Sequence, residues 1–272
     1  MKILLVTNRF KEATYFKAQQ IAAKLREVKL DVFIDDGQEK FNGNIDIIIV
    51  LGGDGTILRA ARQYGQLQVP VLGVNMGTVG FLCNIEANEL NEYVNRLIQG
   101  DFAVDPRMML EAAVYRDNEL VKQVYCLNEI VIKSQYFRMV SFNLNTSAGE
   151  RIGIYRGDGV IIATPTGSTA YSLSSGGPVV DPCLEAFIIT PIASYDINKR
   201  PLIVSANKWI KLTLLENSGA VICMDGQVNL PFDQNCEIQI KKAGCKLKLI
   251  DFKHLPFFSL LGSRLMGNKG EF

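Results

Sequence analysis

The stretch IDIIIVLGGDGT, residues 45–56, decides the fold. Six of its first seven residues are apolar and five are β-branched, which predicts a buried strand of a parallel sheet. Three glycines and Asp54 follow, and a helix is expected from about residue 56 to 63. Ligands of α/β sheets bind where the carboxyl ends of strands meet the starts of helices. The stretch therefore predicts an α/β domain with a binding site at this loop.

Strands and helices alternate on both sides of this stretch. Residues 14–28 and 86–99 have helical spacing, and in the first of these helices Phe16, Ile21, Leu25 and Val28 are predicted to share one face. The other expected strands of this region are 2–7, 31–34 and 69–75. Such alternation predicts a doubly wound α/β domain over residues 1–101.

From about residue 102 the expected elements are short strands separated by turn signals, one of them Ala243-Gly244. One helical stretch, 168–175, interrupts them. The expected strands are 109–116, 121–132, 140–145, 160–163, 209–215, 220–224, 237–241 and 246–252. This pattern predicts an antiparallel β-sandwich domain over residues 102–251. The apolar and aromatic segment 252–272 is expected to pack back on the first domain.

The composition excludes several classes of function. The 272 residues are 48% hydrophobic with a net charge of +1, which indicates a globular protein without a basic surface for nucleic acid. No apolar run is long enough to span a bilayer, so no membrane partner is expected. The six cysteines are widely spaced, which favours free thiols in the cytoplasm over zinc ligands. With His254 as the single histidine, a catalytic base is expected among Asp and Glu.

Asp54 is the unusual member of the glycine loop. Glycines let the backbone approach a ligand closely, and the helix start offers N–H groups to a phosphate. A carboxylate among them repels phosphate unless it holds a cation, orients a hydroxyl or accepts a proton. The alternative is that Asp54 only caps the helix. We favour the functional interpretation because three glycines surround this carboxylate.

A second glycine-rich segment, NMGTVGF at residues 75–81, follows another expected parallel strand. If that strand lies beside strand 45–51, both loops open at the same edge of the sheet. We then expect a shared ligand cleft, the alternative being an ordinary connection from strand to helix.

Polar motifs also interrupt the second half. The segment Thr164–Ser172 (TPTGSTAYS) holds more hydroxyl groups than helix capping needs, which favours a binding loop. Asn128-Glu129, within an apolar stretch, has groups that can hydrogen-bond a ribose diol, although strand residues facing solvent explain the pair equally well. Asp225-Gly226-Gln227 alone indicates a turn.

Together these motifs resemble, in order, the NAD kinase family, whose members phosphorylate the adenosine ribose of NAD. The glycine–aspartate loop alone is shared with diacylglycerol kinases, sphingosine kinases and phosphofructokinases, whereas the segment 164–172 is far more specific. The motifs that carry the resemblance are Gly52–Thr56, Asn75-Met76-Gly77, Gly80-Phe81, Asn128-Glu129, Gly157-Asp158-Gly159, Thr164–Ser172, Gly176-Gly177-Pro178, Arg200-Pro201 and Asp225-Gly226-Gln227.

The resemblance implies transfer of the γ-phosphoryl group of ATP to the 2′-hydroxyl of NAD, with Mg²⁺ or another divalent cation as cofactor. It implies a cytoplasmic homodimer or homotetramer, with NAD between the two domains and across a subunit contact. Asp54 would take the proton of the 2′-hydroxyl, and Gly53 and Gly55 would lie against phosphates. No metal site made of protein side chains is implied.

The same resemblance assigns the remaining contacts. Asn128 and Glu129 would hold the ribose on the adenosine side, and Arg156 and Asp158 would face the nicotinamide end. Arg59 and Arg138 match positions that are often basic and would meet phosphates. The residues that would line the dinucleotide pocket are Thr169, Ala170, Tyr171, Ser172, Leu173, Ser174, Ala193 and Gln227.

The chain departs from the family at one place, and three other functions fit its glycine loop, of which a phosphofructokinase-like sugar kinase is disfavoured because the second half is rich in strands. Many members carry Pro-His where this chain has Ser194-Tyr195, a difference that bears on nucleotide selectivity. A lipid kinase would need an apolar acceptor pocket or a membrane-facing patch, and the sequence has no basic amphipathic helix. A non-catalytic nucleotide sensor would have the same pocket without phosphoryl transfer.

Overall fold

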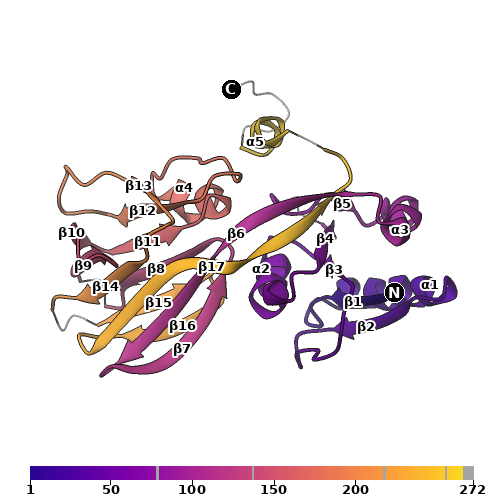
Figure 1. Ribbon diagram of the computed structural model, residues 1–272, viewed down its shortest axis with the longest axis horizontal. Helices are drawn as coiled ribbons and strands as arrows, with labels where there is room; N and C mark the ends of the chain where they lie inside the picture. Colours follow the sequence, from indigo (N-terminus) through magenta and orange to yellow (C-terminus); the bar gives the residue numbers. More distant parts are fainter. Residues whose placement is uncertain (78–79, 137, 217–218, 255, 266–272) are drawn as a thin grey trace. The chain divides into compact units, whose positions relative to one another are not determined.

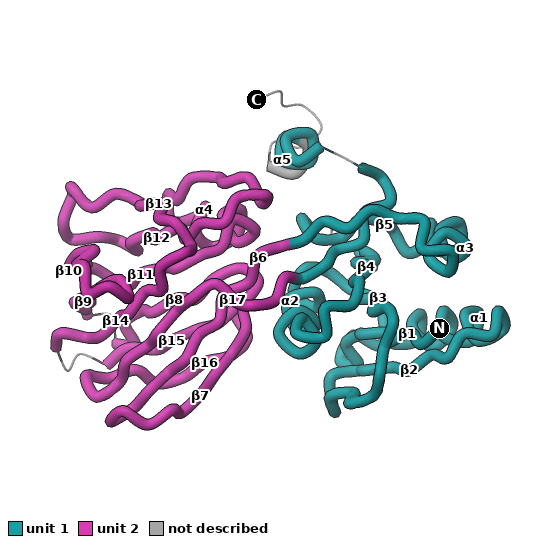
Figure 2. The backbone as a smooth tube through the Cα atoms, in the orientation of Figure 1, with its two compact units in different colours: residues 1–106, 247–272 teal, residues 107–246 magenta. Residues whose placement is uncertain are grey.

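The computed structural model describes residues 1–77, 80–136, 138–216, 219–254 and 256–265 (Figure 1). The chain forms two compact units, residues 1–106 with 247–272 and residues 107–246 (Figure 2). The sequence places the boundaries at 101/102 and 251/252. In the structure the chain passes from one unit to the other inside two long strands, β6 (Ala103–Arg116) and β17 (Cys236–Asp251).

The first unit is a parallel sheet with flanking helices. Its strands lie in the order β2-β1-β3-β4, and β3 pairs with β4 from Ile48↔Val71 to Leu51↔Val74. This pairing confirms that the two strands followed by glycine-rich segments are neighbours. The elements are β1 (Lys2–Val6), α1 (Glu12–Glu27), β2 (Asp31–Asp35), β3 (Ile47–Leu51), α2 (Asp54–Tyr64), the 3₁₀ helix η1 (Gly65–Leu67), β4 (Pro70–Asn75), β5 (Ile85–Glu86) and α3 (Leu90–Gln99).

Helix α1 buries only part of the face that was predicted. Its buried residues include Ala18, Ile21 and Leu25, whereas Phe16 is 62% exposed and Val28, just past the helix end, is 50% exposed. Phe16 precedes Ile21 by five residues, which places it about 140° around the helix axis. The prediction was therefore confirmed for Ile21 and Leu25 and wrong for Phe16 and Val28, because Ala18 and Ala22 complete the buried face beside Ile21 and Leu25.

The two residues directly after β17, Phe252 and Lys253, pack on the first unit. The last part of β17 pairs in parallel with β4 at Lys248↔Pro70, and the Phe252 ring stacks on Tyr93 with 4.5 Å between centroids. Lys253 Nζ lies 2.9 Å from Glu89 Oε1. Helix α5 (Phe257–Leu265) follows, and no helix in the described parts of the chain is both long and apolar enough to span a bilayer.

The second unit is a sandwich of two mostly antiparallel sheets. One sheet has the order β13-β12-β11-β8-β15-β16, and the other contains β10, β9 and β14 with the first part of β17, β6 and β7. Apolar side chains of both sheets, among them Ile130 and Phe142, form one core. The remaining bounds are β7 (Glu119–Cys126), β8 (Glu129–Ser134), β9 (Val140–Thr146), β10 (Arg151–Gly157), β11 (Gly159–Ala163), η2 (Thr166–Thr169), α4 (Tyr171–Ser174), β12 (Ala186–Ile192), β13 (Leu202–Ser205), β14 (Ile210–Leu214), β15 (Ala220–Met224) and β16 (Val228–Phe232). The structure confirms an α/β domain followed by a β-sandwich domain.

Several predicted elements of the second unit were wrong in their limits. The predicted strand 121–132 is two strands, because Leu127 and Asn128 form a junction held by a side chain described below. The predicted turn at Ala243-Gly244 lies inside β17, which stays extended because β14 pairs with its first part and β4 with its last. Strands β10, β12, β13 and β16 were not predicted; Gly153, Pro191 and Pro231 interrupt the pattern in three of them.

A buried carboxylate ties together several parts of the first unit. Asp35, at the end of β2, accepts hydrogen bonds from the Tyr64 hydroxyl at 2.5 Å and from Arg59 Nη1 at 2.7 Å. The Tyr64 oxygen in turn accepts the backbone N–H of Phe41 at 2.9 Å. Burial and the hydrogen bond to Asp35 raise the pKa of Tyr64 well above its usual value, so the hydroxyl remains a donor.

The substitution Tyr64→Phe is expected to destabilise the protein by about 1–3 kcal/mol, because it removes the donor to Asp35 and the acceptor for Phe41 from a buried site. Urea unfolding measures the change. As a matched control, Tyr195→Phe removes a hydroxyl from a side chain that is 74% exposed and should change stability by less than about 0.5 kcal/mol. Equal effects of the two variants would contradict a structural role for this hydroxyl.

Candidate functional site

The Asp54 carboxylate is anchored by the backbone of the second glycine-rich segment. Its Oδ2 accepts the N–H of Phe81 at 2.8 Å, and its Oδ1 accepts the N–H of Leu82 at 3.1 Å. Helix α2 begins at Asp54, and its N-cap residue is Gly53, without a side-chain capping bond. The alternative that Asp54 is only a helix cap was therefore wrong, because its carboxylate binds residues that follow the neighbouring strand.

Gly80 makes this contact sterically possible. A Cβ atom built on Gly80 would lie 2.1 Å from Asp54 Oδ1 and 2.4 Å from its Cγ, closer than any real contact. The Asn75 side chain holds the start of the segment in place. It donates to Glu86 Oε1 at 2.9 Å and accepts the N–H of Gly77 at 3.2 Å. Thr78 and Val79 of the predicted motif lie outside the described residues. The first unit thus brings the two predicted loops together through one carboxylate.

The glycine loop offers a ligand open space and a partial positive charge. A Cβ on Gly53 would meet no atom within 4 Å in the described chain, and the N-terminus of α2 carries a partial positive charge beside Gly53 and Gly55. A carboxylate has about four acceptor positions, and the Phe81 and Leu82 N–H groups fill two of them. Asp54 can therefore still accept the proton of a hydroxyl while the loop binds an anion.

The Arg59 side chain forms an ion pair and hydrogen bonds inside the first unit. Its Nη1 lies 2.7 Å from Asp35 Oδ1 and its Nη2 donates to the Thr7 carbonyl oxygen at 2.7 Å. The predicted contact of Arg59 with phosphate stays a prediction, and it would require these buried bonds to be exchanged.

In the second unit, Asp225 organises the Asn128-Glu129 pair. Its carboxylate accepts three backbone N–H groups, from Leu127 at 2.8 Å, Asn128 at 2.8 Å and Glu129 at 3.1 Å. The Asp225 N–H donates to the Glu129 carbonyl oxygen at 3.0 Å. These bonds end β7 and start β8, so they set where the side chains of Asn128 and Glu129 lie.

Thr164 joins the same junction to the hydroxyl-rich segment. Its hydroxyl donates to the Leu127 carbonyl oxygen at 2.6 Å, and its N–H donates to the Asn128 carbonyl oxygen at 2.8 Å. A Cβ on Gly167 would lie 2.2 Å from that Asn128 oxygen, so the two backbones approach as closely as glycine allows. Ser172 is buried and its hydroxyl bonds to Thr190 at 2.9 Å, which gives this side chain a structural role.

Glu129 is a buried carboxyl group with incomplete hydrogen bonding. Its side chain is 6% exposed, and its Oε2 atom has no hydrogen-bond partner in the described part of the chain. Burial and then the charge of Asp225 raise the pKa of Glu129 to about 8, although a hydrogen bond from the Tyr171 backbone opposes the shift. An unpaired buried polar atom beside the predicted binding loop is the feature expected of a residue that meets a ligand.

The strand register divides the predicted residues of the second unit into two groups. β11 pairs with β8 from Ala163↔Glu129 to Gly159↔Lys133, so the two ends lie about 13 Å apart along the strands. The Glu129 group, at one end, contains Asn128, Glu129, Thr169, Ala170, Tyr171, Ser172, Leu173, Ser174 and Gln227. The Asp158 group, at the other end, contains Arg138, Arg156, Asp158 and Ala193.

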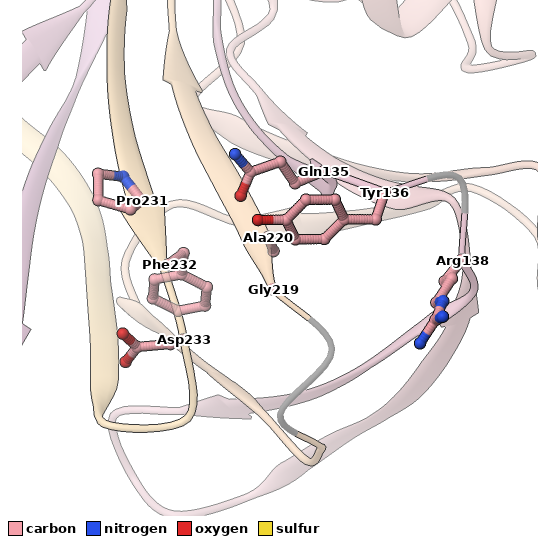
Figure 3. A pocket seen from close by; sticks show the side chains of 8 residues that line it. All are labelled: Gln135, Tyr136, Arg138, Gly219, Ala220, Pro231, Phe232 and Asp233. Atoms are coloured by element: carbon pink, nitrogen blue, oxygen red, sulfur yellow. The ribbon is translucent and has the colours of Figure 1, made fainter.

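Arg138, one member of the Asp158 group, lines a cavity of about 620 Å³ (Figure 3). The Asp158 carbonyl oxygen accepts the Ser134 N–H at 2.8 Å, which places Asp158 at the far end of β8 from Glu129. Arg138 is exposed and lines the cavity with residues from the start of β15 and the end of β16. One chain therefore does not bring Arg138 or Asp158 to Glu129.

Two functional features escaped sequence reasoning. Asp225 was predicted as a turn residue and as part of a family motif but was given no role of its own, yet it is 3% exposed and holds the Asn128-Glu129 junction. The signal available in the sequence was an aspartate directly after an apolar strand and directly before a glycine. In the structure this aspartate has a φ of +48°, as expected in a tight turn. The N–H groups of Phe81 and Leu82 left no signal, because every residue type except proline carries one.

The comparisons with known proteins cover both halves of the chain. Residues 3–102 match the ATP-NAD kinase N-terminal domain and residues 104–252 match the ATP-NAD kinase C-terminal domain. The chain belongs to the ATP-NAD kinase family. It is 38% identical to the NAD kinase of Natranaerobius thermophilus over 226 residues, 82% of this chain and 79% of that protein. It is 40% identical to the NAD kinase of Carboxydothermus hydrogenoformans over 236 residues, 85% of this chain and 82% of that protein.

Solved structures show the same fold. Yeast NADH kinase complexed with NADH superimposes with a TM-score of 0.88 at 22% identity, covering 100% of this chain and 89% of that one. An NAD kinase from Archaeoglobus fulgidus in complex with ATP gives a TM-score of 0.76 at 28% identity, covering 93% and 94%. Family membership over both halves removes the support for a lipid kinase, which would share only the glycine loop.

The substitution Gly80→Ala is expected to reduce, by about a hundredfold, the rate of the reaction for which the family is named, because the new methyl group displaces the Asp54 carboxylate. The rate of NADP formation from ATP and NAD measures the effect. The control is Gly244→Ala, where the added Cβ meets nothing within 4 Å among the described residues. A Gly80→Ala variant with the turnover of the control would show that the contact does not position Asp54.

Proposed function

We propose that this chain transfers the γ-phosphoryl group of ATP to the 2′-hydroxyl of the adenosine ribose of NAD, with Asp54 as the general base. The observation that carries the proposal is the Asp54 carboxylate, placed beside the glycine loop and oriented by the Phe81 and Leu82 N–H groups. Membership of the ATP-NAD kinase family supports the identity of both substrates.

The reaction is an in-line displacement at phosphorus. The 2′-oxygen forms a bond to the γ-phosphorus of ATP, the bond from that phosphorus to the β–γ bridging oxygen breaks, and the hydroxyl proton passes to Asp54. The products are NADP and ADP. Such a reaction depends mainly on positioning and on neutralisation of the phosphate charge. Asp54 contributes the positioned proton acceptor, while the backbone at Gly53 and Gly55 contributes N–H groups and the helix dipole.

The divalent cation is proposed to arrive with ATP. The described residues include no group of three or more His, Cys, Asp or Glu side chains that could hold a metal ion. Mg²⁺ commonly uses one or two carboxylates together with substrate phosphates and water. A cation held mainly by the phosphates of ATP would supply neutralisation of their charge, and the chain would need to add only one or two carboxylate ligands.

NAD is proposed to meet the Glu129 group of one chain and the Asp158 group of another, in a homodimer or homotetramer. The strand register, which separates the two groups, supports this arrangement, as do exposed apolar side chains near the Asp158 group, including Tyr195 and Ile197. None of the six cysteines, all of which lie in the described residues, forms a disulfide, which supports a reducing compartment, the cytoplasm.

The substitution Asp54→Asn is expected to lower turnover by about 10²–10⁴-fold, the usual contribution of a general base, while NAD affinity stays near normal. NADP formation and NAD titration measure the two quantities. Asp101→Asn, at an exposed carboxylate of the same unit, serves as the control. Near-normal turnover of Asp54→Asn would contradict the role of Asp54, and wild-type chain that binds NAD without forming NADP would be a nucleotide sensor.

If each site is shared between two chains, variants that damage different halves of the site should complement each other in mixed oligomers. At an NAD concentration well below the KM of the variants, Glu129→Ala and Asp158→Asn should each lose most activity alone, whereas oligomers assembled from both variants in equal amounts should reach about a quarter of wild-type activity, because half of the sites in mixed dimers carry no substitution. Co-refolding of the two variants, followed by the NADP assay, tests this. An absence of recovered activity in oligomers shown to be mixed would contradict a shared site.

A further inference from the structure

Two carboxyl groups lie together at the start of β8, and their hydrogen bonding differs. Asp225 is fully engaged, with three backbone N–H donors on its two oxygens. Glu129 accepts a hydrogen bond from the Tyr171 backbone, and its Oε2 has no partner among the described residues. Both side chains are buried, so water does not compensate the difference.

This difference decides which group carries the negative charge. An ionised carboxylate only accepts hydrogen bonds, and three N–H donors stabilise the ionised form of Asp225. Two neighbouring buried carboxyl groups do not both ionise readily, because each charge raises the free energy of the other. The proton is therefore held by Glu129, whose Oε2 atom has no donor to satisfy a charge.

We infer that Glu129 binds NAD as a neutral carboxylic acid, donating its O–H group to an acceptor atom of the dinucleotide, and that Asp225 is the positioning residue that keeps it neutral. The inference rests on the proposed function and specifies how one of its residues recognises the substrate. A donor at this position selects a ligand with an oxygen or ring nitrogen there, whereas an ionised glutamate would select a hydroxyl or amino donor.

The groups that interact with Glu129 make the direction of the pH dependence clear. Asp225 and Cys223, both at the end of β15, are the titratable side chains that couple to it, and α4 contributes the Tyr171 backbone N–H. No cation is among these partners in the described chain. Because burial raises the pKa of Glu129 to about 8, the neutral form predominates at pH 6–7 and is lost as the pH rises above 8.

The test is NAD titration of the full chain by calorimetry, without ATP, between pH 6 and pH 9.5. The expected affinity is constant at pH 6–7 and then falls by about tenfold per pH unit above the pKa of Glu129. At pH 9 the heat measured in two buffers of different ionisation enthalpy should show uptake of close to one proton per NAD bound.

Three variants separate recognition from structure. Glu129→Gln keeps a donor that does not titrate, so it should bind NAD with nearly the wild-type affinity at pH 7 and without the decline at high pH. Glu129→Ala should weaken binding by about 5- to 150-fold at pH 7. Glu150→Gln, at an exposed carboxylate of the same unit, should keep the wild-type pH profile.

Two results would overturn the inference while leaving the proposed function intact. One is wild-type NAD affinity that is independent of pH or increases as the pH rises. The other is a Glu129→Gln variant that folds, as judged by circular dichroism, yet binds as weakly as Glu129→Ala. A wild-type chain that binds no NAD at any pH would contradict the proposed function itself.

Discussion

The pair of hydrogen bonds that the Asp54 carboxylate accepts from the backbone N–H groups of Phe81 and Leu82 is the constraint on which the candidate site depends. It exists because β3 and β4 are parallel neighbours, so that the loops following them open at the same edge of the sheet. It also requires glycine at position 80, where any Cβ would overlap the carboxylate. A charged side chain at a helix start is thereby fixed in one orientation, with acceptor positions left for a substrate.

The second unit uses the same device at a different place. A buried aspartate, Asp225, binds the backbone of residues 127–129 and creates the junction at which Asn128 and Glu129 appear. In both units a carboxylate held by backbone donors shapes a loop, and in both a glycine permits two backbones or a backbone and a side chain to approach. The consequences differ: Asp54 remains available for a proton, whereas Asp225 keeps its charge and leaves the proton to Glu129.

The sequence predicted the elements whose signal is local. The apolar strand 45–51, the glycine loop and the change from alternating helices and strands to strands alone all follow from short-range patterns, and the structure has them. It did not predict the limits of β7, β8 and β17, because these depend on partners far along the chain: Asp225 for the junction at Leu127, and β14 and β4 for the extended backbone at Gly244. The separation of the Glu129 and Asp158 groups is likewise a result of strand register, which residue identities alone did not reveal.

The most direct measurement is a crystal structure of the chain with NAD and a non-hydrolysable ATP analogue. The account predicts that an Asp54 carboxylate oxygen lies at hydrogen-bond distance, about 2.6–3.2 Å, from the 2′-oxygen of the adenosine ribose, in line with the terminal phosphate. A complex with both nucleotides bound and this carboxylate remote from either ribose, without a connecting water molecule, would contradict it.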